Sequence, residues 1–218
     1  MRVVSLVPSV TETLLAWGIT PVACTRFCEQ PAIRAVGGTK NPEVAAIVGL
    51  VPDLVVVDEE ENRREDHDAL VEAGLEVHAL AIRSVHDLDP QLSALADRVG
   101  ASWEPIGSLP KPPASTWAFV PIWRRPWMAL GDPTYGASLL AALSVAVVPD
   151  DAGPYPEVEL DDLVADVVLV PSEPYDFKDA HLAELSAVAP AVRVDGQDLF
   201  WWGARTPAAI ERLRAALP

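Results

Sequence analysis

Hydrophobic residues along this chain gather in short continuous runs, and each run is followed by a longer stretch of mixed polarity. The run DLVVV at 53–57 is a clear example, because consecutive β-branched residues are typical of a strand buried on both faces. The next stretch, 64–73, has the composition of a helix, and Gly74 ends it. Runs of the two kinds alternate over most of the sequence. The pattern therefore predicts βαβ units and an α/β fold with mostly parallel central sheets flanked by helices.

Local signals predict where several helices begin in the first half of the chain. Ser9 and Glu12 have the spacing of a capping box for the first helix. Asn41 followed by Pro42 predicts the cap and first position of a second helix, which ends near residue 49. Further strands are predicted at 2–7, 22–24 and 75–82, and a further helix at 84–99.

A proline-rich segment at 107–115, GSLPKPPAS, interrupts the alternation. Proline density of this kind favours a stiff, extended connector. We therefore divide the chain into an N-terminal lobe at 1–84, a linking helix with the proline-rich connector at 85–115, and a C-terminal lobe at 116–218. In the C-terminal lobe, strands are predicted at 116–122, 128–130, 145–148, 167–170 and 192–194, and helices at 135–143, 160–164, 179–187 and 207–216.

The two predicted lobes share a short sequence feature. The strand at 53–57 begins with an aspartate and is followed by Glu60, and the strand at 166–170 also begins with an aspartate and is followed at the same offset by Glu173. In open α/β sheets, ligands bind at the carboxyl ends of the strands. If the two lobes face one another, Glu60 and Glu173 would lie on opposite walls of one cleft.

Composition narrows the classes of partner. The chain has 218 residues, half of them hydrophobic, and a formal net charge of −16, which argues against nucleic-acid or anionic-membrane partners. Two cysteines exclude a disulfide scaffold. A strand begins at once at the N-terminus, with no signal peptide before it and no apolar run long enough to span a membrane. We therefore expect a cytoplasmic protein without membrane insertion, or an extracytoplasmic one if the start of this sequence is truncated.

Polar and aromatic side chains collect in the loops after the predicted strands. The acidic stretch at 58–61 is either part of a ligand site or a solvated turn that opens the next helix. Loop tryptophans likewise suit either a recognition cleft or a small satellite core. The residues that we predict to bind a ligand are Ser9, Thr11, Cys28, Lys40, Glu60, Asn62, Trp123, Trp127, Glu173, Tyr175, Phe177, Trp201, Trp202 and Arg205.

Metal-binding and catalytic patterns are largely missing. Cys24 and Cys28 form a C-x₃-C pair with no second pair, which is not a zinc-ribbon spacing, and the four histidines form no metal-binding motif. The sequence also lacks a nucleophile elbow, a Walker loop and a dinucleotide-binding glycine fingerprint. We therefore predict no metal site and no catalytic residue. An enzyme that uses Glu60 and Glu173 as acid and base, or Cys28 as nucleophile, stays open as an alternative.

Several of these motifs resemble one known group of proteins. The opening residues 2–14, RVVSLVPSVTETL, and the segment 52–55, PDLV, resemble signatures of the cobalamin- and siderophore-binding proteins of ABC importers. A closer similarity is to the subgroup described as helical-backbone metal receptors. Its hallmarks are similar to GGTKNP at 37–42, EENR at 60–63, IWRRPWM at 122–128, SEPYDFK at 172–178 and WGAR at 202–205.

The resemblance implies a class III periplasmic-binding-protein fold, in which one backbone helix, here shortened, joins two lobes with a ligand cleft between them. It implies that a corrinoid such as cobalamin, or a metal chelate, lies against aromatic side chains, while Lys40, Arg205 and the glutamates meet its polar edges. Our leading hypothesis is a non-enzymatic binding protein for such a ligand, with no intrinsic cofactor. The alternative is the substrate-binding component of an ABC importer, with a permease as its partner.

Overall fold

The computed structural model describes residues 1–217, which fold into two compact units. Unit 1 comprises Met1–Ile82, Asp87–Pro105 and Trp202–Arg205, and the remaining described residues form unit 2. The helix at 88–99 thus belongs to unit 1, where the sequence prediction treated it as a separate linking element. The segment 202–205 also belongs to unit 1, although the residues on both sides of it belong to unit 2.

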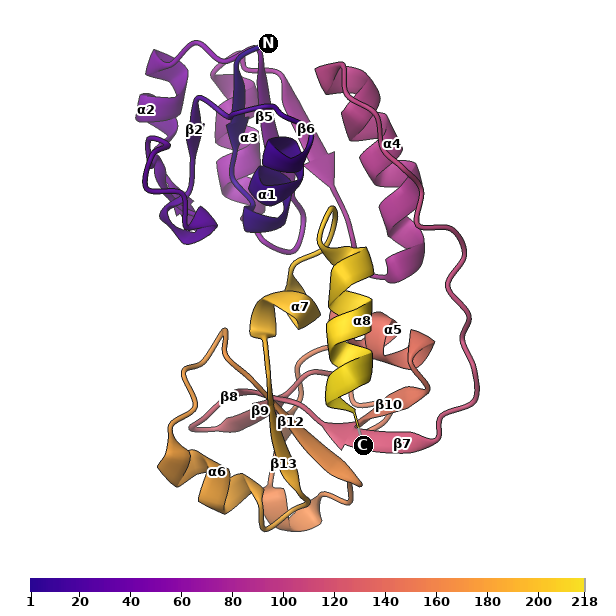
Figure 1. Cartoon of the computed structure of the whole chain (residues 1–218). Helices are drawn as coiled ribbons and strands as arrows, with labels where there is room; N and C mark the ends of the chain where they lie inside the picture. The colour runs from indigo at the N-terminus through magenta and orange to yellow at the C-terminus, as the bar shows by residue number, and fades with distance from the viewer. Residues whose placement is uncertain (218) are drawn as a thin grey trace. The chain divides into compact units, whose positions relative to one another are not determined.

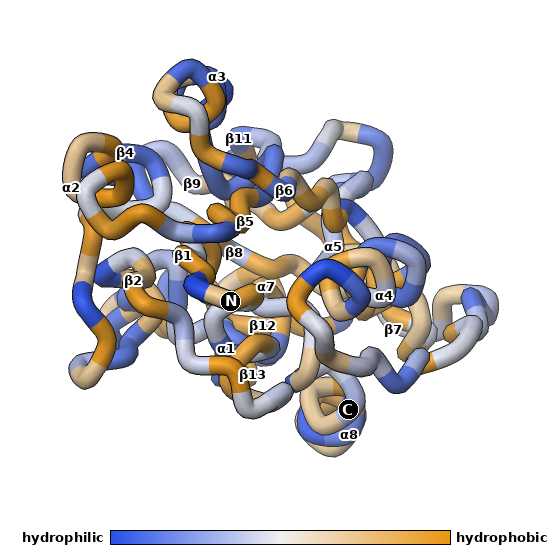
Figure 2. Tube along the Cα trace, turned by 90° about the horizontal axis from the view of Figure 1, so that it is seen from above, coloured by the Kyte–Doolittle hydropathy of each residue, from blue (hydrophilic) through white to orange (hydrophobic). Residues whose placement is uncertain are grey.

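Unit 1 is built on a four-stranded parallel sheet with the order β2-β1-β5-β6 (Figure 1). Helices α1 and α3 lie on opposite faces of this sheet in both views (Figures 1 and 2). The elements are β1 (Val3–Ser5), α1 (Pro8–Ala16), β2 (Ala23–Cys24), η1 (Arg26–Cys28), β3 (Gly37–Gly38), β4 (Asn41–Pro42), α2 (Val44–Gly49), β5 (Leu54–Asp58), α3 (Arg64–Glu72), β6 (Val77–Leu80), η2 (Val85–Asp87) and α4 (Leu88–Val99), although η2 contributes only one residue to this unit.

The hydrophobic run that predicted a doubly buried strand is confirmed by β5, in which all five residues are buried. Val55 and Val57 join Val4, Leu6 and Ile47 in the core of unit 1. Figure 2 shows most of β5 in hydrophobic colours, whereas α3 alternates between hydrophilic and hydrophobic residues. The difference follows from position, since a central strand is covered on both faces and a helix on only one.

The first helix begins differently from the prediction. Val7 is its N-cap, Pro8 is its first residue, and Ser9 lies inside the first turn without capping it. The predicted capping box of Ser9 and Glu12 is therefore wrong. Proline suits the first turn of a helix because its missing N–H has no partner there and its φ is already helical. The side chains of Ser9 and Glu12 are thereby left for a distant contact, described below.

The predicted start of the second helix is also wrong. Asn41 does not cap a helix, because β4, which begins with it, pairs antiparallel with β3. The helix α2 begins after Glu43 instead. Gly37 explains the hairpin: its φ is 92°, and a Cβ at this position would lie 2.5 Å from the Asn41 carbonyl oxygen. The glycine permits an approach of the two backbones that a residue with a side chain would prevent.

Unit 2 contains a second four-stranded parallel sheet, with the order β10-β7-β12-β13, and a small antiparallel sheet with the order β11-β9-β8. All five residues of β12 are buried. The short helix α7 and the strand β11 were not predicted. The elements are β7 (Thr116–Phe119), β8 (Pro121–Trp123), β9 (Trp127–Ala129), α5 (Tyr135–Ala142), β10 (Val145–Val148), β11 (Glu157–Val158), η3 (Leu160–Asp162), β12 (Val167–Pro171), α6 (Asp179–Leu185), β13 (Ala191–Val194), α7 (Gly196–Phe200) and α8 (Thr206–Ala216).

The two parallel sheets share one topology. Counting the four strands of each sheet in chain order, the first strand lies between the second and the third, and the fourth lies at the edge beside the third. The aspartate before the third strand also makes the same contacts in both units. Arg2 N donates to Asp53 Oδ2 at 2.6 Å and Asp53 N to the Arg2 carbonyl at 2.8 Å. Trp117 N donates to Asp166 Oδ2 at 2.8 Å and Asp166 N to the Trp117 carbonyl at 2.8 Å. The shared sequence feature therefore reflects a shared structure.

Candidate ligand-binding site

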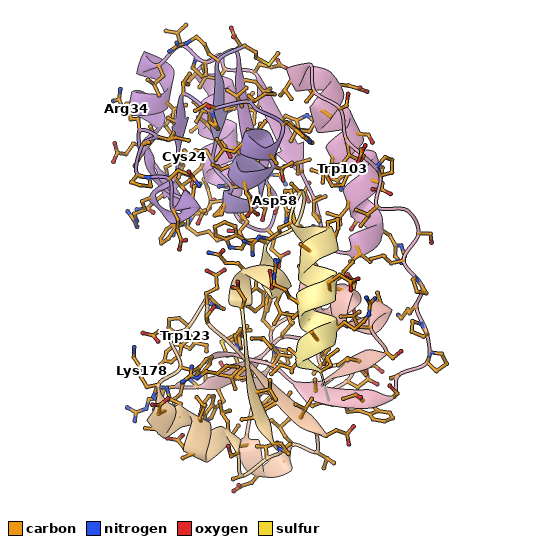
Figure 3. All side chains as sticks on the ribbon, in the orientation of Figure 1. Cys24, Arg34, Asp58, Trp103, Trp123 and Lys178 are labelled. Carbon is orange, nitrogen blue, oxygen red and sulfur yellow. The ribbon has the colours of Figure 1, made fainter. Side chains whose placement is uncertain are left out.

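The acidic turn after β5 is shaped by Asp58, which is 1% exposed (Figure 3). Its Oδ1 accepts hydrogen bonds from the backbone N–H groups of Glu60 at 2.9 Å and Glu61 at 3.3 Å, and its Oδ2 accepts from Ile82 N at 3.3 Å. Burial raises the pKa of Asp58 to about 6, although these backbone donors act in the opposite direction. Asp58 thus folds the turn and ties it to the chain after β6.

Asn62 connects three segments at this edge of the sheet. Its Oδ1 accepts from Asp58 N at 2.9 Å, and its Nδ2 donates to the carbonyls of Leu6 at 3.2 Å and Thr39 at 2.9 Å. Both amide hydrogens are therefore used within the protein, and the residue is 7% exposed. The structure places Asn62 as a support for the loops, and a role in touching a ligand stays a prediction.

Lys40 and Glu60 are exposed at the same edge. The Lys40 ammonium donates to the Glu60 carbonyl and so joins the β3–β4 hairpin to the acidic turn. The hairpin also packs against η1: a Cβ on Gly38 would lie 3.0 Å from the Phe27 ring and 3.2 Å from the Arg26 guanidinium. The guanidinium of Arg26 lies 4.9 Å from the centroid of the Phe27 ring. Sequence reasoning did not select Phe27, which is 49% exposed.

Cys28 is the last residue of η1 and is 1% exposed. Thr11 Oγ1 donates to its sulfur at 3.1 Å, and Thr25 Oγ1 lies 3.2 Å from it. A hydrogen bond from the Cys24 thiol is the main reason that the pKa of Cys28 falls to about 6, and the two threonines act in the same direction against the effect of burial. The same pairing raises the pKa of Cys24. Thr11 and Cys28 were both predicted site residues, and the structure brings them into contact.

Helix α1 holds the segment 202–205. Ser9 Oγ accepts from Trp202 N at 3.2 Å, and Thr13 Oγ1 accepts from Ala204 N at 3.2 Å. Arg205 donates two hydrogen bonds to the Glu12 carboxylate, at 2.8 and 3.1 Å.

Three of the predicted site residues, Ser9, Trp202 and Arg205, therefore take part in the contacts between α1 and the segment 202–205. Trp202 is 4% exposed, so its ring packs within the protein. Its neighbour Trp201 is half-buried and belongs to unit 2.

In unit 2, five rings from β8, β9, α6 and the loop after β12 form one cluster. They are Trp123, Trp127, Tyr175, Phe177 and His181, and we call them the aromatic cluster. Trp123 lies edge-on to Tyr175 with 5.2 Å between centroids, and Trp127 stacks on Phe177 at 6.0 Å. Tyr175 also contacts Phe177 at 4.8 Å and His181 at 5.8 Å. Four of the five rings were predicted site residues.

The aromatic cluster is buried at its base and open at one ring. Phe177 is 2% exposed and Trp123 is 47% exposed (Figure 3). Trp127 is covered by Arg124, whose guanidinium lies 5.5 Å from the ring and pairs with Glu184 at 2.7 Å. Trp127 therefore belongs to a satellite core, whereas Trp123 presents a face to solvent, and its place in a recognition cleft stays a prediction.

The remaining predicted residue of unit 2, Glu173, is half-buried beside α7. A Cβ on Gly196 would lie 2.6 Å from Glu173 Cγ, so the glycine permits this packing. Glu173 and Glu60 belong to different units. That they face each other across a cleft stays a prediction.

Two features are absent from residues 1–217: a cluster of metal-binding side chains and a membrane-spanning helix. Within that range, no group of three or more His, Cys, Asp or Glu side chains could hold a metal ion. The Nδ1 of His181 accepts from Lys178 N at 3.1 Å, which places the ring proton on Nε2. No helix in the same range is long and apolar enough to cross a membrane.

Known proteins share this architecture. A heme-binding protein, the periplasmic BhuT in complex with two hemes, superposes with a TM-score of 0.81 and 18% identity, over 99% of this chain and 97% of that one. The periplasmic vitamin B12-binding protein BtuF of Vibrio cholerae gives a TM-score of 0.77 and 17% identity, over 99% and 95%. The chain has the class III periplasmic-binding-protein fold. The fold expected from the sequence motifs is thus confirmed.

Similarity in sequence covers a smaller part of the chain than similarity in structure. The vitamin B12-binding protein of Salmonella choleraesuis (strain SC-B67) is 32% identical over 100 residues, which are 43% of this chain and 38% of that relative. The match thus spans well under half of the relative's length. No protein-family model matches the chain. All three relatives are named for a ligand that they bind.

Proposed function

We propose that this protein is a non-enzymatic binding protein for a corrinoid or another flat metal chelate, such as heme. The observation that carries the proposal is the class III fold shared with vitamin B12- and heme-binding proteins. In this chain, exposed aromatic residues that suit such a ligand follow parallel strands: Phe27 lies in η1 after β2, and Trp123 ends β8, which comes directly after β7. That is where ligands bind in open α/β sheets.

Two exposed aromatic rings supply flat apolar surface. Phe27 of unit 1 is 49% exposed and Trp123 of unit 2 is 47% exposed. Covering the exposed half of the Trp123 indole would bury on the order of 100 Å², which contributes about 2 kcal/mol. Its edge-on contact with Tyr175 fixes the orientation of the ring before a ligand arrives, so that little entropy is lost on binding.

Exposed charged groups beside the rings supply the polar contacts. Arg26 lies over the Phe27 ring, Lys40 belongs to the hairpin that packs against Phe27, and Lys178 adjoins the aromatic cluster. Their cationic groups suit the carboxylates of a porphyrin or the amide oxygens of a corrinoid, while the Glu60 carboxylate suits amide N–H groups. Ser9, Asn62, Trp202 and Arg205, by contrast, are engaged within unit 1, so we assign them a supporting role.

Titration of the purified protein tests the proposal. Cobalamin, hemin and a ferric siderophore are each added while the visible spectrum and tryptophan fluorescence are recorded. We expect at least one of them to bind in the micromolar range or tighter. If none binds more tightly than millimolar, the proposal is wrong.

A matched pair of tryptophan variants locates the contact. Trp123→Ala is expected to weaken binding by about twentyfold to fiftyfold, which corresponds to the roughly 2 kcal/mol above. Trp117 is the control, because it is 48% exposed but lies beside Asp166 at the amino end of the second sheet. Trp117→Ala is expected to leave the affinity unchanged. Equal losses in both variants would contradict a site at the carboxyl ends of the strands.

The role in an ABC importer is the second candidate, and the fold favours it because both structural relatives are named as periplasmic binding proteins. In that case the partner is a permease, and the ligand-loaded protein would bind it more tightly than the empty protein. The test is co-purification with candidate permeases from the native host, with and without ligand. The expectation of a cytoplasmic protein stays a prediction, which fractionation of the native host decides.

A further inference from the structure

The two cysteines of the chain lie together at the carboxyl end of the first sheet. Cys24 is the last residue of β2 and Cys28 the last residue of η1, and each is 1% exposed. Neither forms a disulfide in this structure. Each cysteine is the largest influence on the pKa of the other, as expected for neighbouring thiols four residues apart that are both buried at this end of the sheet.

The Cys28 sulfur accepts hydrogen bonds from several sides. Besides Cys24, Thr11 Oγ1 donates to it at 3.1 Å and Thr25 Oγ1 lies 3.2 Å away. Thr11 Oγ1 also lies 2.8 Å from Ser5 Oγ and 3.1 Å from the Val7 carbonyl. A hydroxyl has one hydrogen, and an anionic sulfur attracts it more strongly than a neutral oxygen does. Ser5 Oγ meanwhile donates to the Val7 carbonyl at 3.0 Å, which leaves Thr11 available for the sulfur.

This environment differs from that of an ordinary core cysteine. A thiol buried among apolar side chains keeps its proton and is inert, whereas a sulfur with several donors is held as a thiolate. The thiolate is the nucleophilic form of cysteine, and the adjacent Cys24 supplies a second sulfur for it to join. An anion-stabilising pocket and a resolving thiol are the two requirements of a dithiol that oxidises reversibly.

We propose that Cys24 and Cys28 form a reversible disulfide, with Cys28 as the thiolate that a small peroxide oxidises first. The Cys28 thiolate attacks one oxygen of hydrogen peroxide, so an S–O bond forms, the O–O bond breaks, and the leaving hydroxide takes up a proton to become water. The Cys24 sulfur then attacks the Cys28 sulfenic acid. The S–S bond forms as the S–O bond breaks, and the Cys24 proton leaves with the hydroxyl as a second water. The sulfurs lose two electrons and the peroxide gains them.

Burial limits which oxidant can react. Both cysteines are buried, whereas Arg26 and Phe27 of the short turn η1, between them in the sequence, are exposed. Hydrogen peroxide is close to water in size and can reach the pair after a small movement of this turn. A bulky maleimide needs a larger movement and is expected to react much more slowly with the folded protein. This modification does not depend on the proposed ligand, because it involves only the protein and the oxidant.

Peptide mapping tests the proposal directly, since Arg26 lies between the two cysteines. The full-length reduced protein is treated with hydrogen peroxide, blocked with iodoacetamide and digested with trypsin, which cleaves after Arg26. We expect the Cys24 peptide and the Cys28 peptide to remain linked, and dithiothreitol to separate them. In Cys24→Ser, Cys28 is expected to stop at the sulfenic acid, which dimedone traps.

Variants of the hydroxyl donors test the pocket itself. At pH 5, below the pKa of Cys28, Thr11→Val is expected to slow oxidation of Cys28 about tenfold, because a rise of about one pKa unit then lowers the thiolate fraction by that factor, and Thr11→Ser is expected to restore the rate. Thr20→Val at an exposed position is the control and should leave the rate unchanged. Three results would each overturn the proposal: unlinked peptides after oxidation, linkage only between two chains, or no faster reaction of Cys28 than of either cysteine in the denatured chain.

Discussion

The carboxylate of Glu12 binds the guanidinium of Arg205 through two hydrogen bonds, although the two residues are 193 positions apart. The side chains are 31% and 14% exposed, so solvent screens the pair only in part. With the hydrogen bonds of Ser9 and Thr13, this contact fixes the segment 202–205 on α1. Gly203 completes the fit, because a Cβ there would lie 2.2 Å from Thr13 Oγ1.

Glu12→Gln is expected to reduce the free energy of unfolding by about 1–2 kcal/mol, because Arg205 loses its charged partner in a poorly solvated position. Urea denaturation followed by circular dichroism measures the change. Glu211→Gln is the matched control: Glu211 also pairs with an arginine, Arg214, but the two side chains are 71% and 57% exposed. That change is expected to cost less than about 0.5 kcal/mol. Equal losses would show that the Glu12–Arg205 pair behaves as an ordinary surface pair.

Asn62 supports the loops of the first sheet, and two substitutions separate its contributions. Asn62→Ala leaves the carbonyls of Leu6 and Thr39 without their donor, which is expected to cost about 2–3 kcal/mol. Asn62→Asp is expected to cost more, because it places a carboxylate oxygen against those two carbonyl oxygens.

Thermal unfolding of the two variants gives this order directly. The exposed Asn41 offers the control, and Asn41→Ala should change the midpoint little. If the aspartate variant proves more stable than the alanine variant, the donor role assigned to the Asn62 amide is wrong.

Short-range patterns in the sequence predicted most of the fold. The β-branched composition of 54–57 and 167–170 marks both central strands, because a strand covered on two faces tolerates few polar residues. The same reasoning failed for Ser9. As a helix cap, the Ser9 hydroxyl would accept a backbone N–H of its own helix. It accepts Trp202 N instead, a group too far along the chain for local spacing to reveal. The start of the helix at Pro8 was not predicted.

The candidate site was predicted by residue type more successfully than by role. Loop aromatics correctly indicated the aromatic cluster, yet only Trp123 among them is markedly exposed, because Trp127 and Phe177 stack on each other. Phe27 was missed because it stands alone between polar residues and belongs to no aromatic motif. One edge of its ring packs against Gly38, a tertiary contact that local sequence does not reveal.

The stability of the protein should depend on pH through Asp58. Burial raises its pKa from 3.8 to about 6, so the folded protein holds a proton that the unfolded chain releases. This favourable contribution is fully present below the unfolded pKa and is lost as the pH rises through the folded value. Between the unfolded pKa of 3.8 and the folded pKa of about 6, the free energy of unfolding therefore falls by about 3 kcal/mol.

Asp58→Asn removes this titration. The free energy of unfolding of the variant is expected to fall less steeply than that of the wild type between about pH 4 and 6. Urea denaturation at several values in this range, for both proteins, gives the difference, which cancels the titration of the other groups. Parallel curves for the two proteins would contradict a raised pKa at Asp58.

Asp53 and Asp166 hold equivalent positions in the two sheets, each accepting a backbone N–H from the neighbouring first strand. Replacing either by alanine removes one hydrogen bond at the start of a central strand. Each change is therefore expected to cost about 1 kcal/mol, and the two effects should add, because the residues belong to different units. Hydrogen exchange measured by mass spectrometry assigns each loss to its own sheet: Asp53→Ala should increase exchange in β1 and β5, and Asp166→Ala in β7 and β12. If one variant increased exchange in the sheet of the other unit, the two units would not be independent in stability.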